Sequence, residues 1–222
     1  MDIFKKLNEI LINEKIPSKE FEKLMVNNDF IESYFNIFNK LKDIPQDKKF
    51  HPEGNVWNHT KLVIDTAAKV KGFSRNSNRF MWAALFHDIG KIQTTKFIKG
   101  RYRSYNHDTV GEEVTYNILI NYMNKDEAKE VAEIVRFHMH HIYILKDLPF
   151  SNISALTSSK NYHDIVLLFI CDKLGRGNQN ISEKKKALEE INKILDKLRK
   201  ENSEINKEIT KELGEIKEII IK

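Results

Sequence analysis

Apolar side chains recur along much of this chain at the three- and four-residue spacing of an α-helix. From Trp57 to Val70 they fall on one helical face, and residues 79–89 form a second, more apolar run that ends at Gly90. Glycine directly after such a run is typical of a helix C-terminus. Three further helices are expected, one beginning near residue 107 and two spanning 128–138 and 163–174. The pattern therefore predicts an all-α fold.

Two other segments have weaker patterns. Residues 1–45 read as two short helices separated by Pro17, with Ser18 able to cap the second. We expect them to pack on the core that follows. Residues 93–105, which include Gly100, have no helical period and are expected to form an irregular loop.

The tail from residue 182 is expected to be one long, charged, amphipathic helix. Its apolar positions alternate spacings of three and four, with polar Asn202 on the same line: Leu188, Ile191, Leu195, Leu198, Ile205 and Ile209. Such a seam packs either on its own domain or on a second copy, as a coiled-coil homodimer. The expected organisation is N-terminal helices over 1–45, a core over 46–180 and the C-terminal helix over 181–222.

The composition argues against several classes of protein. Apolar residues make up 41% of the chain, with eight glycines and four prolines, which disfavours disorder and turn-rich β folds. The formal charge of +5 suits anionic substrates but is too small to indicate nucleic-acid binding by itself. A single cysteine, Cys171, excludes an intramolecular disulfide, and no stretch resembles a signal peptide or membrane span. We expect a cytoplasmic protein with no membrane partner.

One His-Asp pair stands out from the other two in the sequence. His87 and Asp88 follow the apolar run 80–86, which places an imidazole and a carboxylate at the inner end of a core helix. Burying ionisable groups is costly unless they are paired or bind metal. The His163-Asp164 pair follows the polar residues 158–161 and reads as an ordinary helix start.

Ligands carried by helices must come from several helices to surround one cation. His59 starts one expected helix, His87 and Asp88 end the next, and Asp172 lies in the last turn of the apolar helix over 163–174. A carboxylate there is unfavourable because it is buried and because it lies at the negative end of the helix dipole, so a cation should compensate its charge. A metal ion would do so, and Arg176, one turn later, is the alternative partner.

The order of these residues resembles the HD superfamily of metal-dependent phosphohydrolases. The flanking segments 51–60 and 85–91 look like the HD domain attached to bacterial tRNA nucleotidyltransferases, and similarity continues through 107–113 and 135–139. The resemblance implies an HD-domain helical bundle. Residues 1–45 contain no glycine and no Asp-x-Asp, so the nucleotidyltransferase head is not expected here and nucleotide addition is not inferred.

The resemblance also implies a metal centre with one or two divalent ions. His59, His87, Asp88 and Asp172 would be the principal ligands, and Asp88 could bridge two ions. Two further histidines occupy positions where two-metal members place additional ligands, although each could instead cap a helix end or contact substrate: His107 and His138. Imidazole and carboxylate ligands without cysteine suit Mn, Fe, Co, Ni or Zn, and Mg at an oxygen-rich site.

Two basic residues are candidates for binding phosphate. Lys91 follows the His-Asp pair at the spacing where similar proteins use a basic residue, and Arg176 lies near Asp172 on a turn. Each would stabilise negative charge on a phosphoryl group, and the alternative for each is a solvated surface charge. We expect at most one of His140 and His141 near the site, and His51 in the approach to the first core helix.

The sequence thus predicts a phosphohydrolase that uses a metal-activated water on phosphomonoesters or (cyclic) phosphodiesters of nucleotides or RNA ends. Asp88, Lys91 and Arg176 would act directly on the reacting groups. The main alternative is a non-catalytic module that binds nucleotides or RNA in the same pocket. A third hypothesis, a coiled-coil interaction protein, depends only on the tail.

Overall fold

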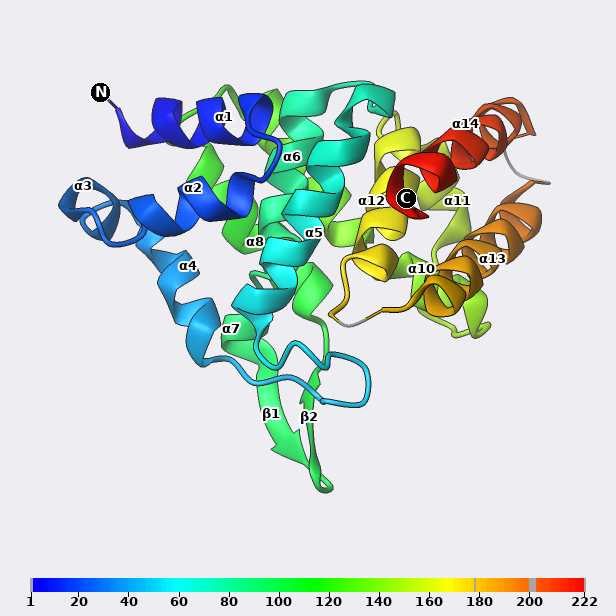
Figure 1. Ribbon diagram of the computed structural model, residues 1–222, viewed down its shortest axis with the longest axis horizontal. Coiled ribbons are helices and arrows are strands. Elements are labelled where there is room, and N and C mark those ends of the chain that lie inside the picture. The colour runs from blue at the N-terminus through cyan, green and yellow to red at the C-terminus, as the bar shows by residue number, and fades with distance from the viewer. Residues whose placement is uncertain (1, 178, 200–202, 222) are drawn as a thin grey trace.

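The computed structural model describes residues 2–177, 179–199 and 203–221. Helices account for most of this part of the chain, and one small hairpin projects from them (Figure 1). The all-α prediction is confirmed. The first elements, through the middle of the chain, are α1 (Ile3–Asn13), α2 (Pro17–Leu24), α3 (Asn28–Ile31), η1 (Tyr34–Asn36), α4 (Ile37–Lys40), η2 (Leu41–Asp43), α5 (Val56–Val70), η3 (Lys71–Phe73), α6 (Ser77–Phe86) and α7 (Lys91–Thr94).

The remaining elements begin with the hairpin. They are β1 (Thr95–Ile98), β2 (Arg101–Ser104), α8 (His107–Leu119), α9 (Lys125–Phe137), α10 (His140–Leu145), α11 (Ile153–Ser158), α12 (Tyr162–Leu174), α13 (Ile181–Leu198) and α14 (Ser203–Ile221). None of the helices in the described ranges is long and apolar enough to cross a lipid bilayer.

Two helices form the centre of the bundle. Residues 80–86 of α6 are all buried, and so is every residue of α12. A helix that is apolar on all sides requires neighbours on all sides. Helices α5 and α9 pack against both, and α1 covers α6 from outside. The ends of α6 and α12 therefore place His87, Asp88 and Asp172 deep in the protein.

The N-terminal segment forms several short helices rather than the two expected, and α1 and α2 pack on this core. Phe4 on α1 stacks on Trp82 of α6 with ring centroids 5.1 Å apart, and the Trp82 indole donates a 2.9 Å hydrogen bond to Asn8. Helix α2 lies against α5, where the Ser18 hydroxyl donates to Asp65. Residues from the first helices thus complete the core.

The prediction of an irregular loop over 93–105 is wrong. Thr95–Ile98 and Arg101–Ser104 pair as antiparallel strands. Lys99 and Gly100 between them both have positive φ angles, of 50° and 78°, as the central residues of a type I′ hairpin turn require. Lys-Gly is a weaker signal for this turn than Asn-Gly, which explains why the sequence did not reveal it.

The tail also differs from the expected single long helix. Helix α13 ends at Leu198 and α14 begins at Ser203, and the two helices pack on each other (Figure 1). Asn202 lies outside the described residues, as does the side chain of Ile205. The expected seam is buried within the chain at Leu188, Ile191, Leu195, Leu198 and Ile209. This packing removes the exposed apolar line on which the homodimer prediction depended, and the homodimer itself stays a prediction.

Polar contacts hold α14 against the start of α12. His163 Nε2 lies 2.7 Å from Glu212, and the Tyr162 hydroxyl donates a 2.6 Å hydrogen bond to Asn206. The prediction that the His163-Asp164 pair marks a helix start is confirmed, and Asp164 also accepts a 2.8 Å hydrogen bond from the Arg75 amide. The pair therefore links the start of α12 to α14 and to the loop before α6.

The His163–Glu212 contact should make stability depend on pH. Burial lowers the pKa of His163, but the hydrogen bond to Asp164 and the charge of Glu212 outweigh it, so the pKa is raised. A raised pKa stabilises the fold below the ordinary histidine value, and this contribution is lost as the pH rises through the folded value. In urea titrations, Glu212→Gln should lower the free energy of unfolding by about 1 to 2 kcal/mol at pH 6 and by less at pH 8.5. Equal costs at both pH values, or the same loss in the exposed Glu215→Gln control, would contradict this assignment.

Gly90 permits a close approach of α7 to α8, and this approach positions His107. A Cβ atom at residue 90 would lie 2.6 Å from the Gly111 amide nitrogen and would also clash with the His107 carbonyl oxygen. Both contacts are with backbone, which cannot move aside. We expect Gly90→Ala to lower the free energy of unfolding by about 1 to 3 kcal/mol in a urea titration. Gly72→Ala, where an added Cβ meets nothing within 4 Å, is the control and should change it little. Equal stability of the two variants would refute the argument.

Candidate metal centre

The Asp88 carboxylate lies between two pairs of imidazoles. Its Oδ2 atom is 3.3 Å from His87 Nε2 and 3.8 Å from His59 Nε2. Its Oδ1 atom is 3.4 Å from His107 Nε2 and 3.7 Å from His138 Nε2. Two ligands that are each about 2.1 Å from one ion stand roughly 3 to 3.5 Å apart. Each oxygen of Asp88 is thus placed to serve a different ion.

The buried residues form two groups that could each hold a metal. His59, His87 and Asp172 offer ligand atoms within 4.8 Å of one another, and His59 Nε2 lies 3.0 Å from Asp172 Oδ1. We call this set, with Asp88 Oδ2, the first half-site. Asp88, His107 and His138 form the second half-site, in which the two histidine Nε2 atoms are 3.2 Å apart. The structure therefore brings all six predicted ligands together, and their binding of metal stays a prediction.

Four histidines share one arrangement that fixes the direction of their rings. In each, Nδ1 lies within hydrogen-bond distance of the backbone carbonyl oxygen three residues earlier: His87 with Ala84 (2.8 Å), His107 with Ser104 (2.7 Å), His138 with Val135 (2.6 Å) and His141 with His138 (2.7 Å). A carbonyl only accepts, so Nδ1 carries the proton. The Nε2 lone pair is then free to bind a metal, as in established metal sites.

Charge in the centre is set by burial and by these close contacts. Burial raises the pKa of Asp88, but the charges of Lys91 and His87 outweigh it and hold the pKa well below its usual range. Burial likewise opposes ionisation of Asp172, yet its hydrogen bond with His59 keeps the pKa well below normal. Burial lowers the pKa of His107. Ionised carboxylates and neutral imidazoles are the forms that bind divalent ions.

Unpaired buried nitrogens support the fit of a metal. His87 Nε2 and His141 Nε2 are buried and have no hydrogen-bond partner among the residues that the structure describes. An unsatisfied buried polar atom is unfavourable unless something binds it. His141 Nε2 also lies 3.3 Å from Asp172 Oδ2, whereas His140 packs against Phe137 with ring centroids 4.7 Å apart. The expectation that at most one of these two histidines approaches the site is therefore confirmed, and it is His141.

Glu53 is a site residue that the sequence reasoning missed. Its Oε1 atom lies 2.9 Å from His59 Nδ1 and 3.0 Å from His51 Nδ1, and its Oε2 atom accepts a hydrogen bond from the Gly177 amide. Burial raises the pKa of Glu53, but the hydrogen bonds to both histidines outweigh it and lower the pKa. His51 lies before the first core helix as expected, and it also faces the site. A carboxylate behind a ligand imidazole orients the ring and makes it a stronger ligand.

Lys91 is buried in the centre, which excludes the alternative that it is a solvated surface charge. Its Nζ atom donates 2.7 Å hydrogen bonds to Asp88 Oδ2 and to Gln46 Oε1. Lys91 begins α7 one turn after Asp88, so the spacing brings the two side chains together. Arg176 lies beyond the end of α12 and lines the cavity described next.

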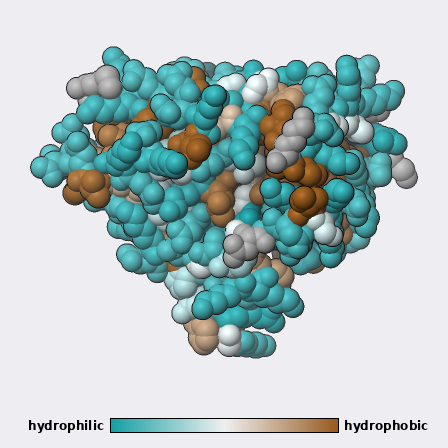
Figure 2. All heavy atoms as spheres, viewed as in Figure 1, coloured by the Kyte–Doolittle hydropathy of each residue, from teal (hydrophilic) through white to brown (hydrophobic). Residues whose placement is uncertain are grey.

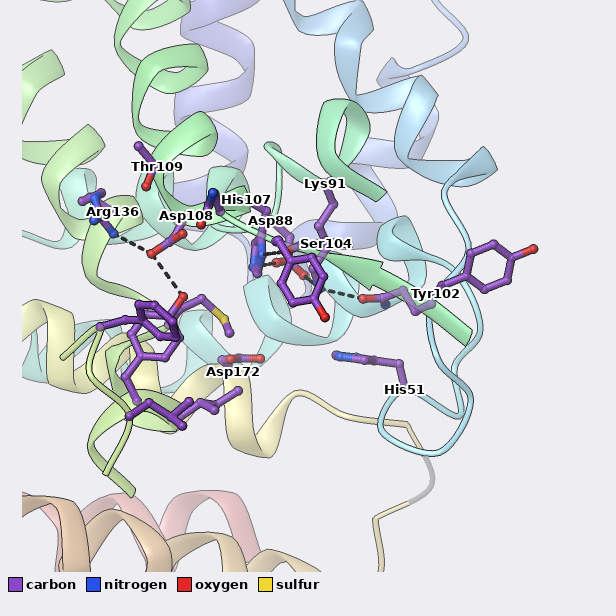
Figure 3. Close-up of a pocket in the computed structure, with 18 of the residues that line it drawn as sticks. His51, Asp88, Lys91, Tyr102, Ser104, His107, Asp108, Thr109, Arg136 and Asp172 are labelled. Carbon is purple, nitrogen blue, oxygen red and sulfur yellow. Dashed lines mark hydrogen bonds and ion pairs between the residues drawn. The ribbon is translucent and has the colours of Figure 1, made fainter. Parts of the chain in front are cut away.

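A cavity of about 470 Å³ opens onto this centre. Figure 3 shows Asp88, His107 and Lys91 on one side of it and Asp172 and His51 on the other. Arg136 also lines the cavity, with its guanidinium bound to Asp108. The remaining wall is largely apolar, with Met139, Ile142, Tyr143, Leu148 and Phe150. The cavity thus combines a charged wall at the carboxylates and histidines with an apolar wall.

The role of Glu53 can be tested through metal affinity. Glu53→Gln preserves the size of the side chain but removes the charge behind His59. We expect Mn²⁺ to bind about 10- to 100-fold more weakly, as typically follows loss of such a contact. The measurement is a calorimetric titration of metal-stripped protein, with exposed Glu9→Gln as the control. An unchanged dissociation constant for Glu53→Gln would show that the contact does not support the metal centre.

Comparison with known proteins agrees with this geometry. The family model described as the HD domain matches residues 56–219. The chain is 27% identical over 149 residues to the multifunctional CCA protein of Actinobacillus pleuropneumoniae serotype 5b (strain L20), covering 64% of this chain and 36% of that protein. It is 25% identical over 177 residues to the namesake protein of Haemophilus influenzae (strain PittGG), covering 76% and 42%.

A third relative, the multifunctional CCA protein of Psychromonas ingrahamii, is 30% identical over 117 residues, which are 53% of this chain and 27% of that protein. The chain thus spans well under half the length of these relatives. The family match, in contrast, covers most of this chain and extends from α5 into α14. HD domains bind divalent metals, and the buried groups of His and Asp side chains fit such an ion. The chain belongs to the HD domain family.

Proposed function

We propose that this protein is a metal-dependent phosphohydrolase. The observation that carries the proposal is the placement of Asp88, which presents one oxygen to each of two half-sites at the edge of a cavity. Imidazoles whose Nδ1 atoms lie against backbone carbonyls, as in His87 and His107, complete each half-site with Nε2 directed inward. A protein that only binds a ligand does not need this number of buried ionisable groups, which are unfavourable without metal.

Two divalent ions fit the arrangement better than one. The first half-site would hold an ion with His59, His87, Asp88 and Asp172, and the second with Asp88, His107 and His138. Such ions supply Lewis acidity toward a phosphoryl oxygen and lower the pKa of a water molecule. His141, beside Asp172, is a further candidate ligand for the first half-site.

The basic side chains of the cavity would bind the phosphoryl group. Lys91 and Arg176 both line the cavity, and Lys91 is held in place by Asp88 and Gln46. Fixed cationic donors stabilise the charge that accumulates on phosphoryl oxygens during transfer. Arg136 contributes charge farther along the cavity, with its position set by Asp108. The apolar wall opposite these residues would contact the organic part of the ester.

The proposed substrates are phosphomonoesters or (cyclic) phosphodiesters of nucleotides or RNA ends. Support comes from the cationic and apolar walls of one cavity and from the relatives, whose names refer to CCA. The alternative function is a non-catalytic module that binds nucleotides or RNA in the same pocket. Turnover separates the two, because a binding module needs no activated water.

Hydrolysis of simple phosphate esters tests the proposal. Metal-stripped protein should regain turnover of p-nitrophenyl phosphate or bis-p-nitrophenyl phosphate when Mn²⁺, Co²⁺, Ni²⁺, Mg²⁺ or Zn²⁺ is added back. Asp88→Asn should lower kcat by more than about 100-fold, because it weakens ligation in both half-sites at once. Asp65→Asn is the control, since Asp65 contacts Ser18 away from the centre.

The ester that is cut distinguishes a monoesterase from a diesterase. Absence of turnover with every metal on both esters and on 2′,3′-cyclic nucleotides, together with nucleotide binding, would reject the hydrolase and favour the binding module. Equal loss of activity in Asp65→Asn and Asp88→Asn would show a structural effect rather than a role of Asp88 in catalysis.

A further inference from the structure

The β1–β2 hairpin carries a dense positive charge that the proposed chemistry does not use. Residues 95–104 include Lys96, Lys99, Arg101 and Arg103, and the sequence contains no Asp or Glu between Asp88 and Asp108. In Figure 1 the hairpin extends away from the helices, and in Figure 2 the same projection is largely hydrophilic. The charge is thus concentrated on a part of the molecule that stands in solvent.

These cationic groups lack acidic partners. In the described part of the chain, no carboxylate lies within ion-pair distance of the four hairpin cations, whereas half-buried Lys61 and exposed Lys197 do form ion pairs. Arg103 instead donates a 2.6 Å hydrogen bond to the Tyr105 hydroxyl and lies over its ring. Like charges that remain uncompensated on a narrow hairpin favour an anionic partner.

Aromatic rings alternate with these charges and are exposed. Phe97 is 65% exposed and Tyr105 is 60% exposed, which is unusual for side chains of this size. Phe97 pairs across the strands with Tyr102, with ring centroids 5.1 Å apart. Cross-strand partners share one face of a hairpin and successive pairs alternate faces, so Phe97 and Tyr102 lie on one face, and the pairs Lys96–Arg103 and Ile98–Arg101 place three of the cations on the opposite face. We call residues 96–105 the hairpin surface.

The hairpin surface leads directly into the cavity of the metal centre. Tyr102, Ser104 and Tyr105 line the cavity, so the aromatic face is continuous with the site, whereas Phe97 lies farther out. Four strand residues span roughly 13 Å, enough for about two or more nucleotides. The loop that supplies Gln46 and His51 to the same cavity adds exposed residues 48–50, where Lys49 lies over the Phe50 ring.

We propose that the hairpin surface binds a single-stranded polynucleotide, RNA or DNA, whose end enters the cavity. Exposed aromatic rings on one face of a narrow hairpin and cationic side chains on the other suit an unpaired strand, whose bases stack on the rings while the long Lys and Arg side chains reach its phosphates around the edges of the hairpin. A duplex has its bases paired and stacked internally and cannot use the rings. An acidic peptide could neutralise the charge but offers no series of planar rings to stack. The entry of the strand's end rests on the proposed function of the cavity, and binding along the hairpin does not.

Equilibrium binding of an oligonucleotide tests the inference. The protein is titrated into a fluorescein-labelled single-stranded 12-mer without terminal phosphate, in RNA and DNA versions, and anisotropy is read at several salt concentrations. We expect Lys96→Ala/Arg101→Ala to weaken binding about tenfold or more at low salt and to reduce the salt slope by about 1.4, as loss of two phosphate contacts requires. Phe97→Ala should weaken binding about fivefold or more through loss of stacking, with little change in the salt slope.

The matched control removes the same charge elsewhere. Lys185→Ala/Lys186→Ala takes away two exposed lysines of α13 and should leave binding within twofold of wild type. Thermal unfolding of every variant checks that each one folds. The inference is overturned if wild-type protein does not bind the 12-mer, if the hairpin variants bind as the control does, if a duplex binds as well as the single strand, or if a mononucleotide binds as tightly as the 12-mer.

Failure of this inference is distinguishable from failure of the proposed function. Hairpin-dependent binding of the 12-mer without hydrolysis of any ester would retain the surface and reject the hydrolase. Metal-dependent hydrolysis of p-nitrophenyl esters without oligonucleotide binding would retain the hydrolase and reject the surface.

Discussion

The burial of two carboxylates among imidazoles is the constraint on which the rest of this structure depends. Asp88 and Asp172 lie at the ends of the two most apolar helices, α6 and α12, where an ion without compensation would destabilise the fold. The histidines and Lys91 compensate the negative charge of these carboxylates, and bound divalent ions would compensate it further. The helices around α6 and α12 exclude water, and exclusion of water strengthens every one of these electrostatic contacts.

The helix ends explain how so many imidazoles can be oriented at once. The last carbonyl groups of a helix have no amide partner within the helix, so they remain free to accept another hydrogen bond. His87 follows α6 and His138 follows α9, and each directs its Nδ1 proton to a carbonyl of the last helical turn, from Ala84 and from Val135, which also accepts a hydrogen bond from the His138 amide. The bundle therefore holds these imidazole rings with its own backbone, which is more rigid than a layer of side chains would be.

The sequence predicted the site best where ionisable residues stand within or directly after apolar helices. A doublet such as His87-Asp88 after an apolar run, and Asp172 within another, cannot be explained by packing alone, so the convergence of these helices could be predicted. The hairpin, by contrast, depends on positive φ angles at Lys99 and Gly100 that the residue types allow but do not demand. The division of the tail depends on tertiary packing of α14 on α5, α12 and α13. Glu53 and His141 approach the centre from a loop and a short helix, where no periodic pattern indicates direction.

The shared position of Asp88 limits how such a protein can change in evolution. A histidine of one half-site can be replaced while the other half-site keeps its own side chains, so the two can change step by step. Asp88 allows no such independence, because its two oxygens face different sets of imidazoles. Any substitution there alters both half-sites at once, and no single compensating change in one neighbour restores both.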